Sequence, residues 1–340
     1  GTSAGGWIGT DSFWLSGHAA DDSLWAFWFF QVVFAGTACT IVSGAMAERT
    51  KFVGYLVYAG LLAAVVYPLG GHWAWGSFGG SFGVGGAKGW LENLGFVDFA
   101  GSTVVHGCGG ACALAGILVV GARHGRFAKD GTPRLIAGHN IPIAALGVFI
   151  LWFGWFGFNG GSALGANGSA AYALVTTQIA AAAAAIAWLV VEKIVRGKGS
   201  VLGAASGAVA GLVVITPAAG FVTVSGALIM GLIGGVVCFW GISGLKRILK
   251  ADDSLDAFGL HGVGGIVGAI LTAVFASSFI MGDKAPTDVM HQLWVQVEGV
   301  LATIAYSAVV TFILLKIIDV VIGIRVESDD ERMGLDLSQH

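Results

Sequence analysis

Long runs of apolar residues divide the chain at nearly regular intervals, with short polar segments between them. A helix needs about 20 apolar residues to cross the hydrocarbon core of a bilayer. The runs predict nine membrane-spanning helices, at 23–46, 52–70, 101–121, 138–158, 170–192, 201–216, 223–245, 257–279 and 293–322. The short run at 201–216 has glycine at every fourth position (Gly203, Gly207, Gly211), a spacing typical of helices that pack closely in lipid.

Composition also indicates a membrane protein. The chain is 56% hydrophobic and 11% charged, whereas soluble domains carry about 25% charged residues. Continuous runs, rather than alternating ones, argue against a β-barrel. We therefore expect an all-α integral membrane protein that forms a single membrane domain over residues 1–340, with a short tail from about 323. A net charge of −3 and cysteines scattered through apolar runs indicate no nucleic-acid partner, metal or cofactor.

Basic residues in the loops predict how the chain is oriented, because lysine and arginine concentrate on the cytoplasmic side. If the first loop, with Arg49 and Lys51, is cytoplasmic, only Lys88 and Lys284 of the 17 basic residues fall outside. We expect a multi-pass protein of the inner or plasma membrane. The amino end of this chain would lie outside and the tail in the cytoplasm.

Two similar motifs interrupt the apolar pattern. HGCGG (106–110) lies in the third run and HGVGG (261–265) in the eighth. Strict alternation makes the third helix run inward and the eighth outward. Similar motifs on oppositely directed helices are typical of inverted repeats, whose functional site lies between the repeats near the middle of the membrane.

Ionisable residues within a membrane are expensive and usually functional. The candidates are His106 and His261, with Asp98 and Asp256 at the entrances of two runs. Two neutral imidazoles can share a proton and line a pore for a small polar molecule, and the glycines that follow would let the two helices approach. Axial ligation of a haem by the two histidines is an alternative from another class.

Aromatic residues gather toward the expected outer side. Phe30 and Phe34 share a helix face, Trp75 follows the second run, and Phe158 and Ser162 lie four apart in WFGFNGGS. Aromatic faces with a hydroxyl oxygen suit a small cation, through cation–π attraction and hydrogen bonding. Ordinary packing at the membrane interface would explain each of these residues taken singly.

The chain resembles the ammonium transporter family, in its microbial and plant branch, which is related to the Rhesus proteins. The resemblance covers essentially the whole chain. It is carried by FFQVVFAGTACTIVSGAMAERTKF (29–52), YPLGGHWAWG (67–76), VDFAGSTVVHGCGG (97–110), LWFGWFGFNGGS (151–162), GAASGAVAGLVVITPAAG (203–220), DAFGLHGVGGIVG (256–268) and IGIRV with ERMGLDL (322–337).

The resemblance implies a transporter rather than an enzyme, in which ammonium binds outside, loses a proton, and crosses as ammonia. It also assigns roles by position. These are the outer ammonium site (Trp75, Ser162), a vestibule aromatic (Phe30), the stacked gate (Phe34, Phe158), the twin pore histidines (His106, His261) and a supporting acid (Asp98).

The family fold implies a homotrimer with one pore per subunit, whose cytoplasmic face often meets a PII-type signal protein. Family members usually have eleven spans, and the nine expected here match spans three to eleven. We therefore expect that two amino-terminal spans are missing from this sequence. Relatives that bind ammonium without conducting it, fused to a signalling module, supply a second hypothesis: an ammonium receptor.

Overall fold

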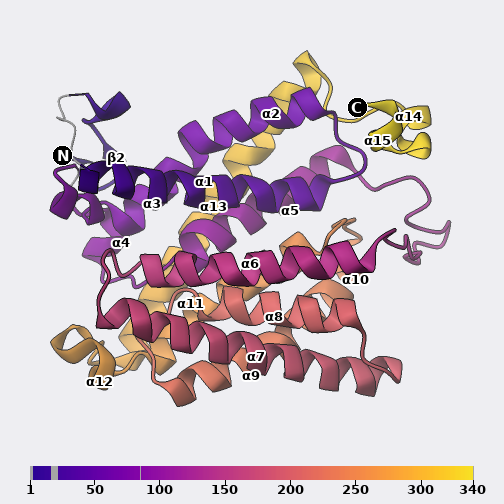
Figure 1. Ribbon diagram of the computed structural model, residues 1–340. Helices are drawn as coiled ribbons and strands as arrows, with labels where there is room; N and C mark the ends of the chain where they lie inside the picture. Colours follow the sequence, from indigo (N-terminus) through magenta and orange to yellow (C-terminus); the bar gives the residue numbers. More distant parts are fainter. Residues whose placement is uncertain (1–2, 17–21, 85, 340) are drawn as a thin grey trace.

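The apolar runs fold into helices, most of which lie side by side and cross the molecule along a similar direction (Figure 1). The computed structural model describes residues 3–16, 22–84 and 86–339. Within these residues, eight helical segments are long and apolar enough to cross a membrane, and α8 is a ninth, shorter one. The first four crossings are α1 (Asp22–Met46), α2–η2–α3 (Phe52–Leu61, Leu62–Val66, Tyr67–Trp75), η4–α5 (Ser102–Gly107, Cys108–Val120) and α6 (Ile141–Gly161).

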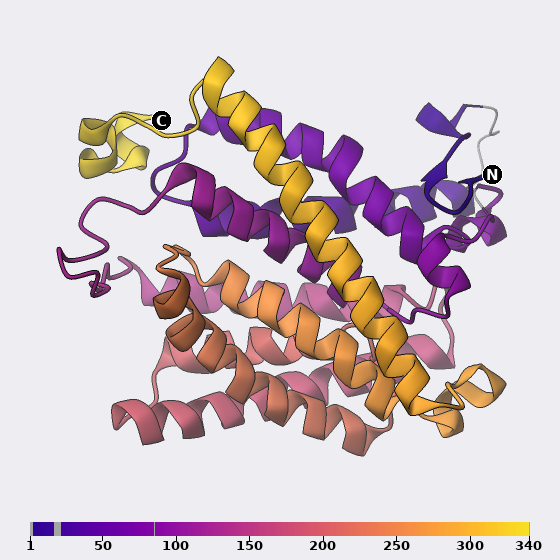
Figure 2. The ribbon, with the colours of Figure 1, turned by 180° about the vertical axis from the view of Figure 1, so that it is seen from behind.

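The second part of the chain supplies the other crossings. They are α7 (Gly168–Arg196), α8 (Val201–Ile215), α9–η5–α10 (Val224–Trp240, Gly241–Leu245, Lys246–Leu249), η6–α11 (Phe258–Gly262, Val263–Phe275) and α13 (Val289–Val321). Figure 2 shows α13, the long gold helix, running diagonally across the helices of the first and of the second part of the chain. The helical membrane fold expected from the sequence is thus present.

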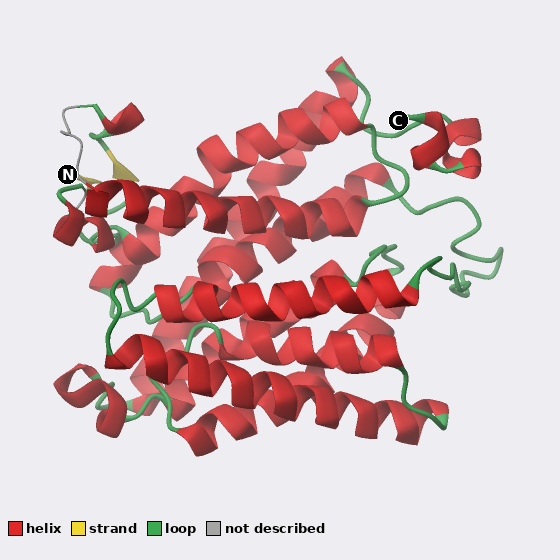
Figure 3. Ribbon diagram, in the orientation of Figure 1, coloured by secondary structure: helices red, strands yellow, loops and turns green. Residues whose placement is uncertain are grey.

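Short elements occupy the connections and the ends of the chain (Figure 3). They are β1 (Ser3–Ala4), β2 (Ile8–Gly9), η1 (Phe13–Leu15), η3 (Phe78–Phe82), α4 (Trp90–Asn93), α12 (Ser278–Met281), η7 (Gly282–Lys284), α14 (Ser328–Met333) and α15 (Leu335–Ser338). The amino-terminal strands and the carboxyl-terminal helices lie at opposite ends of the bundle (Figure 1). An odd number of crossings requires this arrangement.

Several helix ends differ from the apolar pattern. The second run was expected at 52–70, but its helix continues to Trp75, past Gly70 and Gly71. The fourth was expected at 138–158, and its helix spans Ile141–Gly161 instead. Glycine and polar residues ended both runs in the sequence, whereas hydrogen bonds and packing keep the backbone helical beyond them. The two helices therefore extend as far as Trp75 and Gly161, the latter directly before Ser162.

Helices η4–α5 and η6–α11 cross at their glycines. A Cβ atom built on Gly110 would lie 2.4 Å from the Cα of Gly262, and one on Gly265 would lie 3.0 Å from the amide nitrogen of Gly107. The earlier glycine of one helix meets the later glycine of the other, so the two segments run in opposite directions. This is the relation that inverted repeats require.

Small residues also bring α7, α8 and α9 together. A Cβ on Gly211 would lie 2.3 Å from the carbonyl oxygen of Ala180, and one on Gly207 would lie 2.6 Å from the Cβ of Trp188. A Cβ on Gly231 of α9 would lie 2.4 Å from the same carbonyl oxygen. Contact between bare backbones drives helix association in lipid. The glycine spacing in the short run therefore produces the close helix packing that it predicted.

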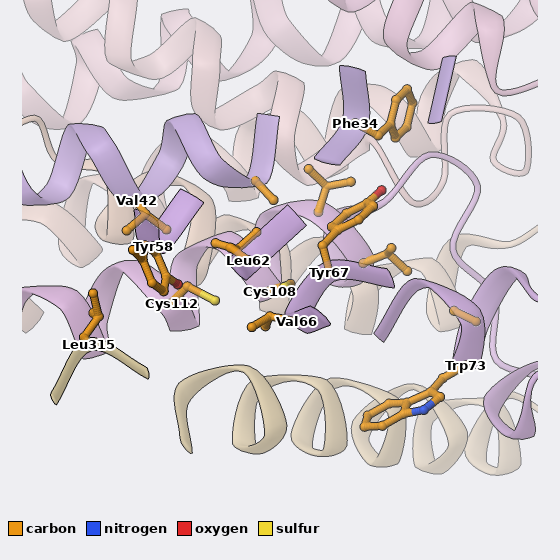
Figure 4. Packing of buried hydrophobic residues seen from close by; sticks show 14 of the residues in the cluster. Phe34, Val42, Tyr58, Leu62, Val66, Tyr67, Trp73, Cys108, Cys112 and Leu315 are labelled. Atoms are coloured by element: carbon orange, nitrogen blue, oxygen red, sulfur yellow. The ribbon is translucent and has the colours of Figure 1, made fainter. Parts of the chain in front are cut away.

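A buried hydrophobic cluster fills the space between α1, α2–η2–α3, α5 and α13. Figure 4 labels ten of its members (Phe34, Val42, Tyr58, Leu62, Val66, Tyr67, Trp73, Cys108, Cys112 and Leu315). The exterior of the helix bundle is apolar as well: Phe153 on α6, for example, is 78% exposed. An apolar interior inside an apolar exterior is what a protein solvated by lipid needs.

Candidate functional site

The two motif histidines face each other across the crossing of η4 and η6. The Nδ1 atoms of His106 and His261 lie 3.1 Å apart. The His106 side chain is fully buried, and that of His261 is partly buried. At this distance one neutral ring donates a hydrogen bond through Nδ1 and the other accepts it. The pair is therefore joined through the inner nitrogens, which leaves the outer Nε2 atoms available.

Asp98 fixes the start of the segment that carries His106. Its Oδ1 atom accepts hydrogen bonds from the backbone N–H groups of Gly101 (2.7 Å) and Ser102 (3.0 Å). Its Oδ2 atom accepts from Thr103 (2.9 Å) and Val104 (3.1 Å). One buried carboxylate thus satisfies four donors that a helix start leaves unpaired. Asp98 therefore has the geometry of a positioning residue.

Asp253 does the same for the segment that carries His261. Its carboxylate accepts from the backbone N–H groups of Ala257 (2.9 Å) and Gly259 (3.1 Å), and its side chain is fully buried. Burial raises the pKa of this loop carboxyl from 3.8 to about 6, against the opposing effect of Lys246. Each histidine segment therefore begins at a buried carboxylate, which accepts four backbone hydrogen bonds in Asp98 and two in Asp253.

Sequence reasoning missed Asp253 and considered Asp256 instead. Asp256 forms an ion pair with Lys246, and its side chain is 33% exposed, so it does not cap the histidine segment. A signal for the right residue was present: Asp98 precedes His106 by eight positions, and Asp253 precedes His261 by eight. The repeated spacing, rather than nearness to the apolar run, identifies the capping acid.

Aromatic rings stack directly above the histidine pair. Phe34 from α1 and Phe158 from α6 lie parallel, with ring centroids 4.1 Å apart and planes at 11°. Phe30, one turn earlier on α1, packs on Phe34 at 4.4 Å. The Phe158 ring is 5.5 Å from the ring of His106. The stacked phenyl rings and the histidine pair thus form one continuous column.

Trp155 also belongs to this column, although the sequence did not single it out. Its ring stacks on His106 at 5.1 Å and lies 6.5 Å from His261. Its indole N–H donates to the Thr216 hydroxyl at 2.9 Å, which fixes the ring. Trp155 lies three positions before Phe158, so both face the same side of α6. That spacing was the available signal.

Trp75 and Ser162 lie at the other end of the stack. The indole N–H of Trp75 donates to the Asp98 carbonyl oxygen at 2.8 Å, and its ring meets the edge of Phe34 at 6.1 Å. Ser162 ends α6, and its hydroxyl donates to the Phe158 carbonyl oxygen at 2.8 Å. The structure therefore brings into one connected set all eight residues to which the resemblance assigned a role, whereas Asp256 lies outside it.

This arrangement can bind, exclude and pass small molecules. Two stacked phenyl rings form an apolar constriction, through which a charge is expensive to move. The imidazole pair beyond it offers hydrogen bonds in an otherwise apolar wall. The haem alternative does not fit, because two nitrogens at hydrogen-bond distance leave no room for an iron and its macrocycle between them.

Known proteins resemble this chain over most of its length. The family model described as Ammonium Transporter Family matches residues 1–340. An ammonium transporter of Bacillus subtilis (strain 168) is 43% identical, over 92% of this chain and 74% of its own. Ammonium transporter Amt1 of Archaeoglobus fulgidus is 42% identical, over 96% of this chain and 78% of its own.

Solved structures share the fold. A structure described as Sensor Amt Protein has a TM-score of 0.92 and 37% identity, covering all of this chain and 83% of its own. The crystal structure of Candida albicans Mep2 has a TM-score of 0.79 and 35% identity, covering 89% of this chain and 66% of its own.

Proposed function

Because this chain belongs to the ammonium transporter family, we propose that it recruits ammonium ion at Trp75 and Ser162 and conducts ammonia past the paired histidines. The observation that carries the proposal is the continuous column of stacked phenyl rings and joined imidazoles. A charged, hydrogen-bonding cation can be held at one end of such a column. A small neutral molecule can pass along it.

The outer end has the chemistry to hold a cation. Trp75, Phe34 and Phe30 present aromatic rings, whose faces attract an ammonium ion. The Ser162 hydroxyl donates its proton to the Phe158 carbonyl, so its oxygen lone pairs remain available to accept an N–H bond from ammonium. Asp98 supports this site, since its backbone carbonyl holds the Trp75 ring.

The stacked rings of Phe34 and Phe158 act as the gate. They lie between the outer site and His106, and their separation of 4.1 Å leaves no passage until a ring moves. A bare cation would lose its water and its outer partners on entering this apolar constriction. Release of a proton before or at the gate removes that penalty, so we propose that ammonia is the species that passes.

The histidine pair supplies hydrogen bonds beyond the gate. The Nε2 atom of His106 is buried and has no partner within the described part of the chain. Buried polar atoms normally have partners. Ammonia both donates and accepts, so it can satisfy this atom in passing. We propose that the pair stays neutral and lines the pore.

Assembly and placement follow the family. We propose a homotrimer in the inner or plasma membrane, with the amino end of this chain outside and the tail in the cytoplasm, where a PII-type protein would bind. The broad exposed apolar surface, which includes Phe29 and Phe153, supports burial against lipid and other subunits. The distribution of basic residues supports the orientation.

The decisive test is ammonium-driven flux in proteoliposomes, followed by an internal pH dye and by membrane current. Saturable ammonium uptake above that of empty vesicles would support conduction. Ammonium binding without any flux would overturn conduction and favour the receptor hypothesis. The similarity to the structure described as Sensor Amt Protein is the reason for testing that alternative. Empty vesicles and vesicles with the His106→Ala protein serve as controls.

A further inference from the structure

A cavity of about 330 Å³ opens at the end of the bundle opposite the outer aromatic site. It lies where the loop before α6, the end of α7 and the helical segment η5–α10 meet. Its volume falls at the lower end of small-molecule sites, which measure about 300–1,000 Å³. Five of its lining residues are cationic and none is acidic; the five are Arg126, Arg134, Arg196, Lys246 and Arg247.

The loop before α6 holds two of these arginines side by side. Phe127 and Pro133 pair as an antiparallel bridge. The N–H of Arg134 donates to the Arg126 carbonyl oxygen at 2.7 Å, and the Arg126 guanidinium donates to the Arg134 carbonyl. These bonds hold the backbones of Arg126 and Arg134 side by side, so two side chains of like charge line the same cavity. Such an arrangement is stabilised when an anion lies between them.

Nearby acids neutralise only part of this charge. Three of the five cations have carboxylate partners: Arg126 with Asp252 (3.2 Å), Arg196 with Glu192 (3.1 Å), and Lys246 with Asp256. Arg134 and Arg247 form no ion pair with any residue in the described ranges. Two of the five cations that line the cavity therefore have no carboxylate partner within the described ranges.

The cavity adjoins exposed apolar side chains. Leu135 in its wall is 89% exposed, and Ile194, two residues before Arg196, is 78% exposed. Apolar side chains therefore stand next to a basic hollow at the ends of membrane helices. This is the arrangement that takes the headgroup of an anionic lipid, whose acyl chains lie along the apolar side chains.

We propose that this cavity binds the phosphate group of an anionic phospholipid through Arg134 and Arg247. In the orientation proposed above, this lipid would belong to the cytoplasmic leaflet. The phosphate site itself does not depend on that orientation. Guanidinium groups match phosphate through paired N–H donors. The site is separate from the ammonium path, because none of its lining residues belongs to the column of aromatic and histidine rings.

Lipid binding to the purified full chain in detergent tests the proposal directly. Native mass spectrometry would give dissociation constants for dioctanoyl phosphatidylglycerol, dioctanoyl phosphatidylcholine and inorganic phosphate. The Arg134→Gln/Arg247→Gln protein should bind phosphatidylglycerol about 10- to 30-fold more weakly than the unaltered chain. The Arg134→Lys/Arg247→Lys protein keeps both charges but loses the paired N–H donors, so its affinity should lie between those of the unaltered chain and the glutamine variant.

Lys129→Gln/Lys198→Gln is the matched control, because it removes the same charge from exposed positions outside the cavity. It should bind phosphatidylglycerol as the unaltered chain does. An equal loss in the control would overturn the proposal, since general surface charge would then explain binding. Equal affinity for phosphatidylglycerol and phosphatidylcholine would overturn it too. Inorganic phosphate binding as tightly as the lipid would support the phosphate site and overturn its assignment to a lipid.

Discussion

The Nδ1 atoms of His106 and His261 lie 3.1 Å apart although 155 positions separate the two residues in the chain. Their contact depends on two oppositely directed helices that cross at glycines. Neither histidine can therefore be treated alone: removing one leaves the other with a buried ring nitrogen that has lost its partner.

Replacement of either histidine by alanine should lower ammonium flux. Loss of a buried hydrogen-bond partner costs about 1–3 kcal/mol, which corresponds to roughly a 5- to 160-fold decrease in rate. Flux in proteoliposomes would measure it, with size-exclusion chromatography to check assembly. His291→Ala, at an exposed position, is the control and should transport normally. Unchanged flux in both His106→Ala and His261→Ala would contradict the proposed pore.

The outer site should control affinity more than maximal rate. Ser162→Ala removes a hydrogen bond to a cation, which is worth about 1.5–3 kcal/mol, so the half-saturating ammonium concentration should rise about tenfold or more. Trp75→Leu should raise it by a smaller factor, because cation–π attraction contributes about 0.5–2 kcal/mol. Measuring the initial flux at a series of ammonium concentrations separates the half-saturating concentration from the maximal rate.

Trp28→Leu offers a matched control for the tryptophan change, since Trp28 is exposed on α1 and outside the aromatic column. Its half-saturating concentration should equal that of the unaltered chain. If Ser162→Ala and Trp75→Leu also left this concentration unchanged, ammonium would not be recruited at these two side chains.

The glycine crossing should tolerate no added methyl group. In Gly110→Ala, the new Cβ would lie 2.4 Å from the Cα of Gly262, so the helices must separate, at a cost of about 1–3 kcal/mol. Thermal unfolding in detergent should show a lower midpoint. Gly147→Ala, where no atom lies within 4 Å of the added group, should unfold at or above the original temperature. Equal midpoints for the two variants would argue against tight packing at the crossing.

Asp253 should make stability depend on pH. Burial raises its folded-state pKa from 3.8 to about 6, with Lys246 and Asp256 nearby. A raised pKa means that the folded protein binds the proton more tightly, so the gain in stability is complete below 3.8 and is lost as the pH rises through about 6. Between pH 7 and pH 5 the unaltered chain should gain about 1 kcal/mol relative to Asp253→Asn.

Unfolding temperatures of both proteins at several pH values would test this. The advantage of the unaltered chain over Asp253→Asn should grow as the pH falls from 7 to 5. Asp329→Asn, at a side chain that is 92% exposed in the tail, should show no such change. A constant difference between the unaltered chain and Asp253→Asn would mean that Asp253 does not titrate in this range.

The sequence by itself determined the membrane class, the nine crossings and the residues of the column other than Trp155. Apolar runs of sufficient length leave few alternatives in lipid, because every backbone polar group must be paired within the segment. The two H-G-x-G-G motifs placed both histidines within crossings, and a spacing of four placed Phe30 with Phe34 and Phe158 with Ser162 on shared helix faces. These are local properties that periodicity reveals.

Only the tertiary structure decided which residues meet. The stacking of Phe34 on Phe158, and of Trp155 on His106, joins helices that are distant in the chain. The choice of Asp253 over Asp256 as the second capping acid depends on which carboxylate the loop turns inward. Apolar periodicity specifies that a helix forms and which face it buries. The partner across that face is set by packing between segments, which no local pattern contains.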